Sequence, residues 1–474
     1  MSFQKYISEV AVEAQISANK MQMKEKTEQK VQVGKAVPVI LFLMIFSLVI
    51  DNSFKIISPK LVEYFGTSAS TVSWQVTLAG LVIGMGAVVY ASLSDSISIR
   101  TLLIVGVSLI SLGSLFGYLV HANLWFVVLA RVIQAAGLGA TETLYLIFVA
   151  RYVEPAKQKK YMGFSTSSFQ LATVIGTLTG GFITTFMAWQ NLFLVPLLSL
   201  LVIPFILKYL PKERGVRKHI DILGIVLIAT VAVSSMVYLT NFSWLMLGLF
   251  ITSVAVFLAY ISKKKNAFIT IGFFKNKLFV FTLVVALLIY STQAAFTLNA
   301  FSFLMTDVYK IGLDAVSLMF IPACLAAAIV GSLSGLIARK LNSVSAVTIA
   351  MLVIIGSILA GTFLMGASLI VFVALLILSS CAFAMMYAPL MHTSLEKMPD
   401  ENKGTAIGFY NLCINIAMSI GFTYSSRFID GLNLHLNFFQ TGIKGHYSEV
   451  LFVIAGIAFL ALLVFQGMVK HQTK

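Results

Sequence analysis

The sequence predicts an all-α membrane protein with fourteen transmembrane helices, from its composition, its apolar segments and its charge distribution. Of its 474 residues, 59% are hydrophobic and 11% are charged, and the mean hydropathy is +0.95. Soluble domains carry about a quarter of charged residues, so lipid is the solvent of most of this chain. The composition therefore excludes a soluble enzyme, a coiled coil and a disulfide-stabilised secreted scaffold.

The apolar segments define the helices in order. A transmembrane helix needs about 20 mostly apolar residues to cross a hydrocarbon core of ~30 Å. By this rule the spans lie at 36–59, 72–93, 100–120, 124–150, 161–186, 190–209, 221–240, 243–262, 278–304, 313–337, 343–367, 370–391, 404–429 and 449–468. The polar residues 1–35 lack the short apolar core of a signal peptide, so we expect them to form a cytoplasmic tail.

The basic residues predict the orientation, since cytoplasmic loops carry an excess of Lys and Arg. When the loops between the fourteen spans are assigned alternately to the two sides, 27 of the 33 Lys and Arg residues fall on the side of the termini and 4 on the other, while Lys55 and Arg131 lie within spans. We therefore expect a multi-pass protein of the cell membrane with both termini in the cytoplasm. This topology accounts for the net charge of +15 without a nucleic-acid partner.

A short internal repeat predicts the domain organisation. The loop at 91–100 contains Ser-Leu-Ser and ends on Arg100, and the loop at 331–340 repeats Ser-Leu-Ser before Arg339. The two loops are 240 residues apart, which is the length of eight spans. We expect a tail (1–35), a six-helix half (36–209), an inserted helix pair (210–277) and a second six-helix half (278–474).

Several motifs resemble those of the major facilitator superfamily, specifically its 14-helix drug:proton antiporter branch. Leu93, Asp95 and Arg100 match the loop motif G-x-L-x-D-x-x-G-[RK]-[RK], although Ala91, Ser98 and Ile99 depart from it. Residues 131–137 are close to R-x-x-Q-G-x-G, with Ala135 in place of a glycine, and Asp51 resembles the acidic residue of the first span. Residues 47–55, 72–75 and 129–134 resemble the Gram-positive tetracycline/proton antiporters.

The resemblance implies two halves that alternately open to the two sides of the membrane. It implies a small-molecule drug and H⁺ as partners, carried by a chain without a cofactor that works as a monomer. The drug would travel either free or as a divalent-metal chelate.

Four ionisable residues lie well inside spans: Asp51, Lys55, Arg131 and Glu142. A charge at mid-bilayer costs from ~3 to more than 10 kcal/mol, so it faces a cavity or a partner. By helical rise, Asp51 lies roughly 22 Å above the inner start of its span and Arg131 roughly 10 Å below the outer start of its span. These depths nearly coincide, so we expect the two side chains to interact.

Asp51 is our first candidate for the proton-coupling carboxylate, with Arg131 as its regulator. The alternative is that Asp51 pairs with Lys55, one helical turn away, as a structural anchor. Glu142 lies on the same helix face as Arg131 but ~16 Å nearer the cytoplasm. It would receive a cationic group of the drug or pass the proton inward, unless it only forms hydrogen bonds with Thr141 or Thr143.

Other candidates concern the gate, helix packing and substrate contacts. We expect Asp95 and Arg100 to form a gate at the inner mouth, with a solvated loop pair as the alternative. The small residues Ala172, Gly176, Gly180 and Gly181 form a ridge for close helix contact, in which Thr177 replaces the proline of the family's motif. The polar residues that we expect to contact substrate are Gln134, Tyr290, Gln293, Asn299, Asn411 and Asn415.

Together these features predict proton-coupled efflux of amphipathic drugs, with tetracycline as the expected substrate. The six histidines show no metal-ligand spacing, and the chain lacks a Walker motif, so we expect neither a metal site nor an enzyme. One alternative is an exporter of quaternary ammonium compounds or lipids with the same fold. Another is a nutrient importer coupled by proton symport.

Overall fold

A computed structural model describes residues 33–94, 97–211, 221–264, 276–333, 341–396, 398, 400–432 and 442–472. Every regular element in these ranges is helical. Fourteen segments are long and apolar enough to cross a membrane, which confirms the predicted fold class. The predicted tail (1–32 of it), most of the loop 211–220 and the second copy of the repeat (334–340) lie outside the described residues.

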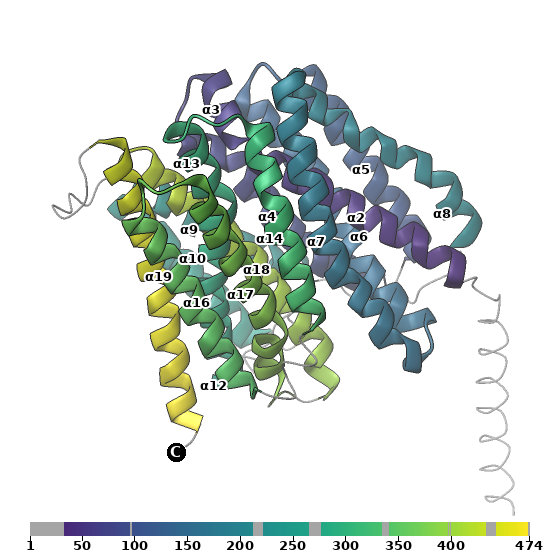
Figure 1. Ribbon diagram of the computed structural model, residues 1–474. Coiled ribbons are helices and arrows are strands. Elements are labelled where there is room, and N and C mark those ends of the chain that lie inside the picture. Colours follow the sequence, from purple (N-terminus) through teal and green to yellow (C-terminus); the bar gives the residue numbers. More distant parts are fainter. Residues whose placement is uncertain are drawn as a thin grey trace, which may run out of the picture.

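The helices form two halves and an inserted pair, as Figure 1 shows. The first half contains α2 (Val33–Ile56), α3 (Ser58–Phe65), α4 (Ala69–Leu93), α5 (Ile99–Leu119), α6 (Leu124–Tyr152), α7 (Pro155–Phe186), η1 (Trp189–Phe193), η2 (Val195–Val202) and α8 (Ile203–Tyr209). The pair is α9 (Ile222–Asn241) and α10 (Trp244–Lys263). The second half contains α12 (Lys277–Gln293), η3 (Ala294–Ala300), α13 (Phe301–Asp307), α14 (Leu313–Ser332), α16 (Ser343–Phe363), α17 (Leu369–Leu395), α18 (Asp400–Ile429) and α19 (Ile443–Gln472).

Polar residues at the loop ends fix where several helices begin. The side chains of Ser68, Ser98, Asn123 and Asn342 each accept a hydrogen bond from a backbone N–H in the first turn of the following helix. Such N-caps contribute about 1 kcal/mol each, because the first N–H groups of a helix have no partner within it. These caps therefore determine the residues at which the apolar helices begin.

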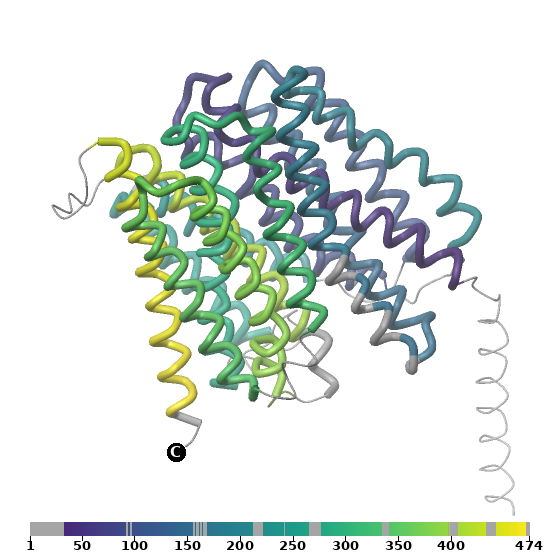
Figure 2. Tube along the Cα trace, in the orientation of Figure 1, coloured from purple at the N-terminus to yellow at the C-terminus, as the bar shows by residue number. Residues whose placement is uncertain are grey.

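The two halves touch along two seams, α4 against α18 and α7 against α14. We call the end of the bundle at which α2 begins and α19 ends the terminal face, and the other end, which carries α3 and α13, the opposite face (Figure 1). In the trace of Figure 2, the purple-to-blue first half and the green-to-yellow second half come together toward the opposite face. They lean apart toward the terminal face.

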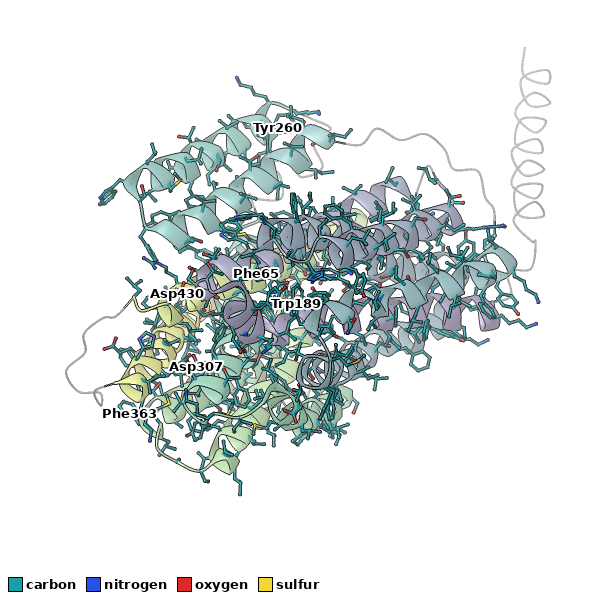
Figure 3. All side chains as sticks on the ribbon, turned by 90° about the horizontal axis from the view of Figure 1, so that it is seen from above. Phe65, Trp189, Tyr260, Asp307, Phe363 and Asp430 are labelled. Atoms are coloured by element: carbon teal, nitrogen blue, oxygen red, sulfur yellow. The ribbon has the colours of Figure 1, made fainter. Side chains whose placement is uncertain are left out.

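The inserted pair lies along one side of the bundle, where Tyr260 is labelled in Figure 3. Helix α9 packs on both α4 and α18, and Met236 and Ala232 contact Leu81 in a small apolar cluster. At the end of the pair, Asp221 accepts hydrogen bonds from Tyr260 (2.5 Å) and Lys264 (3.0 Å). The Tyr260 hydroxyl and the Asp221 carboxylate raise the pKa of Lys264 above its usual value. The pair therefore covers the seam between the halves from the lipid side.

Three local features were not predicted. The sixth span consists of η1, η2 and α8 instead of one α-helix, and Pro196 and Pro204 lie in the first turns of η2 and α8. The ninth span contains a π-helix, η3. The short helix α3 starts at Ser58 and ends at Gly66, which has a left-handed backbone (φ 59°).

Candidate functional site

The predicted contact between Asp51 and Arg131 is present in the middle of the first half. Asp51 and Lys55 are one turn apart on α2, and Arg131 reaches them from α6. One carboxylate oxygen of Asp51 lies 3.0 Å from Arg131 Nη2 and the other lies 2.5 Å from Lys55 Nζ. Asp51 therefore makes both contacts that the sequence offered as alternatives, and these three side chains with Gln134 form what we call the charge cluster.

The remaining donors of Arg131 are also largely occupied. Its Nη1 donates to Gln134 Oε1, and Gln134 Nε2 donates to Ser114 Oγ at 2.8 Å on α5. The guanidinium lies 4.4 Å from the ring centre of Phe54, a cation–π contact. The buried Nε of Arg131 has no hydrogen-bond partner. The charge cluster thus ties α2, α5 and α6 together through a fully buried arginine.

The formal charges of the charge cluster do not cancel. Asp51 carries one negative charge against the two positive charges of Lys55 and Arg131. The carboxylate of Glu142, further along α6, lies within electrostatic reach of Asp51 and Lys55.

Glu142 is the half-buried carboxylate beside the charge cluster. It lies deep inside the protein yet keeps accessible surface, and no hydrogen bond or ion pair of its side chain occurs within the described ranges. The hydroxyl of Tyr387, on α17 of the other half, lies within electrostatic reach of it. Glu142 and Tyr387 therefore lie near each other although they belong to different halves, and we call them the interior pair.

Some of the predicted substrate contacts surround the interior pair. Asn411 accepts a hydrogen bond from Tyr387 (3.3 Å) and, like Gln293, keeps accessible surface. Tyr290 is 3% exposed, and its ring lies 6.5 Å from that of Tyr387. Its buried hydroxyl has no hydrogen-bond partner of good geometry.

The other predicted substrate contacts lie elsewhere. Gln134 is fully buried in the charge cluster. Asn299, in η3, donates to Ser425 and Ser426 of α18 at 2.8 and 2.9 Å. Asn415 lies on the seam between α18 and α4, against Gly84. These three side chains have structural partners, and contact with substrate stays a prediction for them.

The ridge on α7 makes the close contacts expected of small residues. A Cβ on Gly176 would lie 2.6 Å from the carbonyl oxygen of Val49, and one on Gly180 would lie 2.5 Å from that of Ser53. Both glycines therefore face α2, whereas Gly181 faces Ser317 of α14 across the halves. Ala172 is fully buried nearby, and α7 continues through Thr177 without interruption.

The predicted gate is only partly described. Asp95 lies outside the described residues, and Arg100 is half-buried at the start of α5. Arg151 at the end of α6 was not predicted as part of the gate; it donates to the backbone oxygen (2.7 Å) and hydroxyl (3.0 Å) of Ser94 at the end of α4. The sequence feature that could have indicated Arg151 is a basic residue in the last turn of a span.

Two further side chains were missed. Tyr387 gave no signal, since an aromatic residue in an apolar span is usually part of the packing. Glu449 is buried (8% exposed) in the second turn of α19, inside an observed span. It was not predicted because it lies at the edge of the predicted span.

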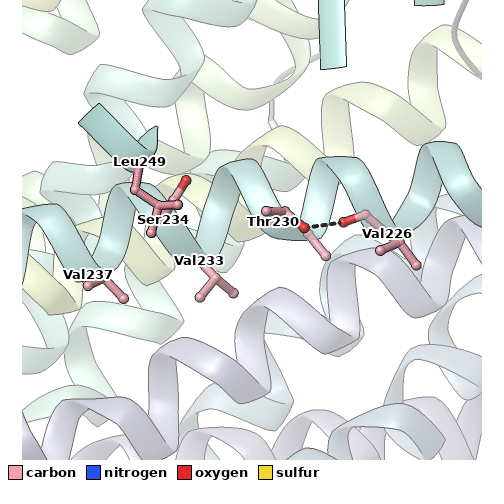
Figure 4. Close-up of a pocket in the computed structure, with 7 residues that line it drawn as sticks. Val226, Thr230, Val233, Ser234, Val237 and Leu249 are labelled. Carbon is pink, nitrogen blue, oxygen red and sulfur yellow. Dashed lines mark hydrogen bonds between the residues drawn. The ribbon is translucent and has the colours of Figure 1, made fainter. Parts of the chain in front are cut away.

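A groove of about 330 Å³ runs along the inserted pair, away from the interior pair. Figure 4 shows its lining, in which the hydroxyl of Thr230 bonds to the backbone oxygen of Val226 at 2.9 Å. The lining is otherwise mostly aliphatic, with Val233, Val237 and Leu249. Within the described ranges, no three His, Cys, Asp or Glu side chains gather as a metal site requires.

Fourteen apolar spans in two halves, with a buried charge cluster in the first half, define a membrane transporter and not an enzyme. Residues 40–422 match the Major Facilitator Superfamily, and the chain belongs to this family. Its substrate is accordingly a small molecule that crosses the membrane.

Similar proteins include the uncharacterized MFS-type transporter YfiU of Bacillus subtilis (strain 168), 25% identical over 81% of this chain and 78% of that protein. The methyl viologen resistance protein SmvA of Salmonella typhimurium (strain LT2) is 26% identical over 42% of this chain, which spans only 41% of SmvA's length. The crystal structure of the human organic anion transporter MFSD10 (TETRAN) superimposes with a TM-score of 0.60 at 15% identity, covering 92% of this chain and 99% of that one. This likeness is one of fold.

Proposed function

We propose that the chain exports amphipathic drugs from the cytoplasm in exchange for protons, with the terminal face on the cytoplasmic side of the cell membrane. The observation that carries the proposal is the charge cluster, in which a single carboxylate bonds two buried cations beside the free carboxylate of Glu142. The 27 to 4 distribution of basic residues supports the orientation. The likeness to a drug resistance protein supports the substrate class.

The proton and the drug act on adjacent carboxylates. Protonation of Asp51 removes its charge, which weakens its bonds to Lys55 and Arg131 and loosens α2 from α6. Glu142 binds the cationic group of the drug while it is ionised and releases the drug when it is protonated. Because the two carboxylates interact electrostatically, a charge change at one alters the other's proton affinity. This coupling makes drug and proton alternate.

Tetracycline is the first substrate to test, because the motifs of α2, α4 and α6 resemble those of tetracycline/proton antiporters. The hydroxyl of Tyr290 and the amides of Gln293 and Asn411 supply hydrogen bonds for a drug with several oxygen atoms, free or chelated to a divalent metal. Transport by a monomer requires no further residues, since the charge cluster and the interior pair come from one chain.

A second candidate is export of quaternary ammonium compounds or similar permanent cations. SmvA is named for resistance to methyl viologen. The unpartnered Glu142 carboxylate, with the rings of Tyr387 and Tyr290 opposite, suits a cation that offers no hydrogen bonds. A proton-symport importer is disfavoured because no observation in the structure supports it.

Transport into everted membrane vesicles tests the proposal. Vesicles from cells that express the chain should accumulate tetracycline, or methyl viologen in a parallel assay, when their interior is made acidic. A protonophore should abolish the accumulation, and vesicles without the chain serve as the control. Accumulation that persists with the protonophore, or requires ATP, would contradict proton coupling.

A further inference from the structure

A carboxylate of the second half binds the end of a helix of the first half at the opposite face. Asp430, directly after the last turn of α18, accepts hydrogen bonds from the backbone N–H of Ala69 (2.5 Å) and of Ser70 (2.8 Å). Ala69 and Ser70 are the first two residues of α4. These N–H groups have no acceptor within the helix, and the helix dipole favours a negative charge at this end.

Each partner is fixed to its own half. Asn299 of η3 bonds to Ser425 and Ser426 in the last turns of α18, so Asp430 moves with the second half. On the other side, Ser68 caps α4 locally by accepting a hydrogen bond from Thr71 N–H at 3.2 Å. Separation of the halves at this face therefore has to break both bonds of Asp430.

This contact differs from the other links between the halves. The ion pairs Asp51–Lys55, Asp51–Arg131, Lys60–Glu63, Glu154–Lys157 and Asp221–Lys264 each lie within the first half or the inserted pair. Gly80 and Gly181 let the halves approach closely, at Ser419 and Ser317. The hydrogen bond from Thr185 to Asp314, which also joins a carboxylate to the other half, is a single exposed bond of 3.4 Å. Asp430 supplies two short charge-assisted bonds, which are about twice as strong as neutral ones.

We propose that Asp430 is a positioning residue of the transport cycle, which holds the opposite face closed and sets how often it opens. The inference rests on the proposed alternation of the two halves, but it concerns a residue outside the charge cluster and the interior pair. Removing the carboxylate should favour the form that is open at the opposite face, whatever the substrate.

Distance measurement by double electron–electron resonance on the full chain in lipid nanodiscs tests this proposal. Spin labels on Glu63→Cys and Ser368→Cys, both exposed at the opposite face on different halves, report its opening. The native Cys324, Cys381 and Cys413 are first replaced by Ser. Asp430→Ala should increase the ratio of long to short distances at least about tenfold, since each of the two lost hydrogen bonds to a charged group is worth enough to shift an equilibrium by that factor. Asp430→Asn, which keeps one acceptor oxygen, should give a smaller increase.

Ser68→Ala is the matched control, because it removes the local cap of the same helix end without touching the link between the halves. It should leave the distance distribution unchanged. An unchanged distribution in Asp430→Ala, or an equal shift in Ser68→Ala, would overturn the proposal. The measurement needs neither drug nor proton gradient. Its result can therefore be interpreted even if the proposed drug transport is wrong. Asp430→Asn also serves if Asp430→Ala does not fold.

Discussion

At the scale of single residues, the proposed function depends on two carboxylates, Asp51 and Glu142, which have different surroundings. Asp51 is bonded on both oxygens, whereas Glu142 is bonded on neither within the described ranges. Removal of the negative charge should therefore have different consequences at the two positions. Measurements of protein stability and of transport should distinguish the two residues.

Asp51→Asn should destabilise the protein. It leaves Arg131 and Lys55 buried without a counter-charge, and removing one partner of a buried pair costs about 3–5 kcal/mol. Denaturation in detergent measures the change in the free energy of unfolding. Glu63→Gln, which removes the exposed partner of Lys60, is the control, and exposed pairs contribute less than about 1 kcal/mol. Equal losses in the two variants would contradict the buried role of Asp51.

Glu142→Gln should leave the stability unchanged within about 0.5 kcal/mol, because the side chain has no structural partner in the described part of the chain. Its transport of a cationic drug should fall about tenfold, which corresponds to the loss of one charge-assisted contact. Initial rates for a cationic and an uncharged drug measure the effect. If Glu142→Gln lowers both transport rates and the stability in parallel, the role of Glu142 is structural instead.

The Asp51–Arg131 contact could be predicted because it needs only the helical rise and the position of each residue in its span. The contacts of Phe54 with Arg131 and of Ser114 with Gln134 depend on side-chain packing, which a sequence does not reveal. Tyr387 could not be paired with Glu142, because they belong to different halves and the angle between the halves is not encoded in any local pattern.

At the scale of helices, the ridge on α7 shows why glycine is required at particular positions. Gly176 and Gly180 allow the backbones of α2 and α7 to approach, and the hydroxyl of Ser53 bonds to the carbonyl oxygen of Gly176 at 2.8 Å across the contact. Asp51 lies on the same helix as Ser53. The ridge therefore also positions the carboxylate of the charge cluster.

Gly180→Ala should destabilise the protein by about 1–3 kcal/mol, because the added Cβ would lie 2.5 Å from the carbonyl oxygen of Ser53. Gly248→Ala on α10 is the matched control. A Cβ there would have no neighbour within 4 Å, and alanine favours helices over glycine, so we expect no loss. Thermal unfolding of both variants gives the comparison, and equal stability would contradict the close packing of α2 on α7.

The helix count and the ridge could be predicted because hydropathy and residue size are local properties of the sequence. The π-helix η3 and the 3-10 segments η1 and η2 could not, since their hydrogen-bond pattern depends on the neighbouring helices. In η3, the amide nitrogen of Asn299 donates to Ser425 of α18, a partner that lies more than a hundred residues away.

At the scale of the whole molecule, the halves meet at the opposite face through Asp430 and lean apart at the terminal face. The interior pair should therefore be reached from the terminal face. This arrangement suits the uptake of a drug from the side on which both termini lie.

In a cysteine-free background, Glu142→Cys should react with a membrane-impermeant thiol reagent added on the side of the termini, and not with reagent added on the other side. Tyr64→Cys, exposed on α3 at the opposite face, is the control and should show the reverse pattern. Labelling of intact cells and of everted vesicles supplies the two sides. Reaction of Glu142→Cys from the side of Tyr64 would mean that the molecule opens the other way.

The central claim is that the carboxylates of Asp51 and Glu142 couple drug export to proton entry. Its most direct test is drug-induced proton movement, followed with a pH-sensitive dye in everted vesicles that hold a proton gradient. Addition of drug should release protons through the unaltered chain and through Gly248→Ala, but not through Asp51→Asn or Glu142→Gln. Proton release that persists in the double variant Asp51→Asn, Glu142→Gln would contradict the account.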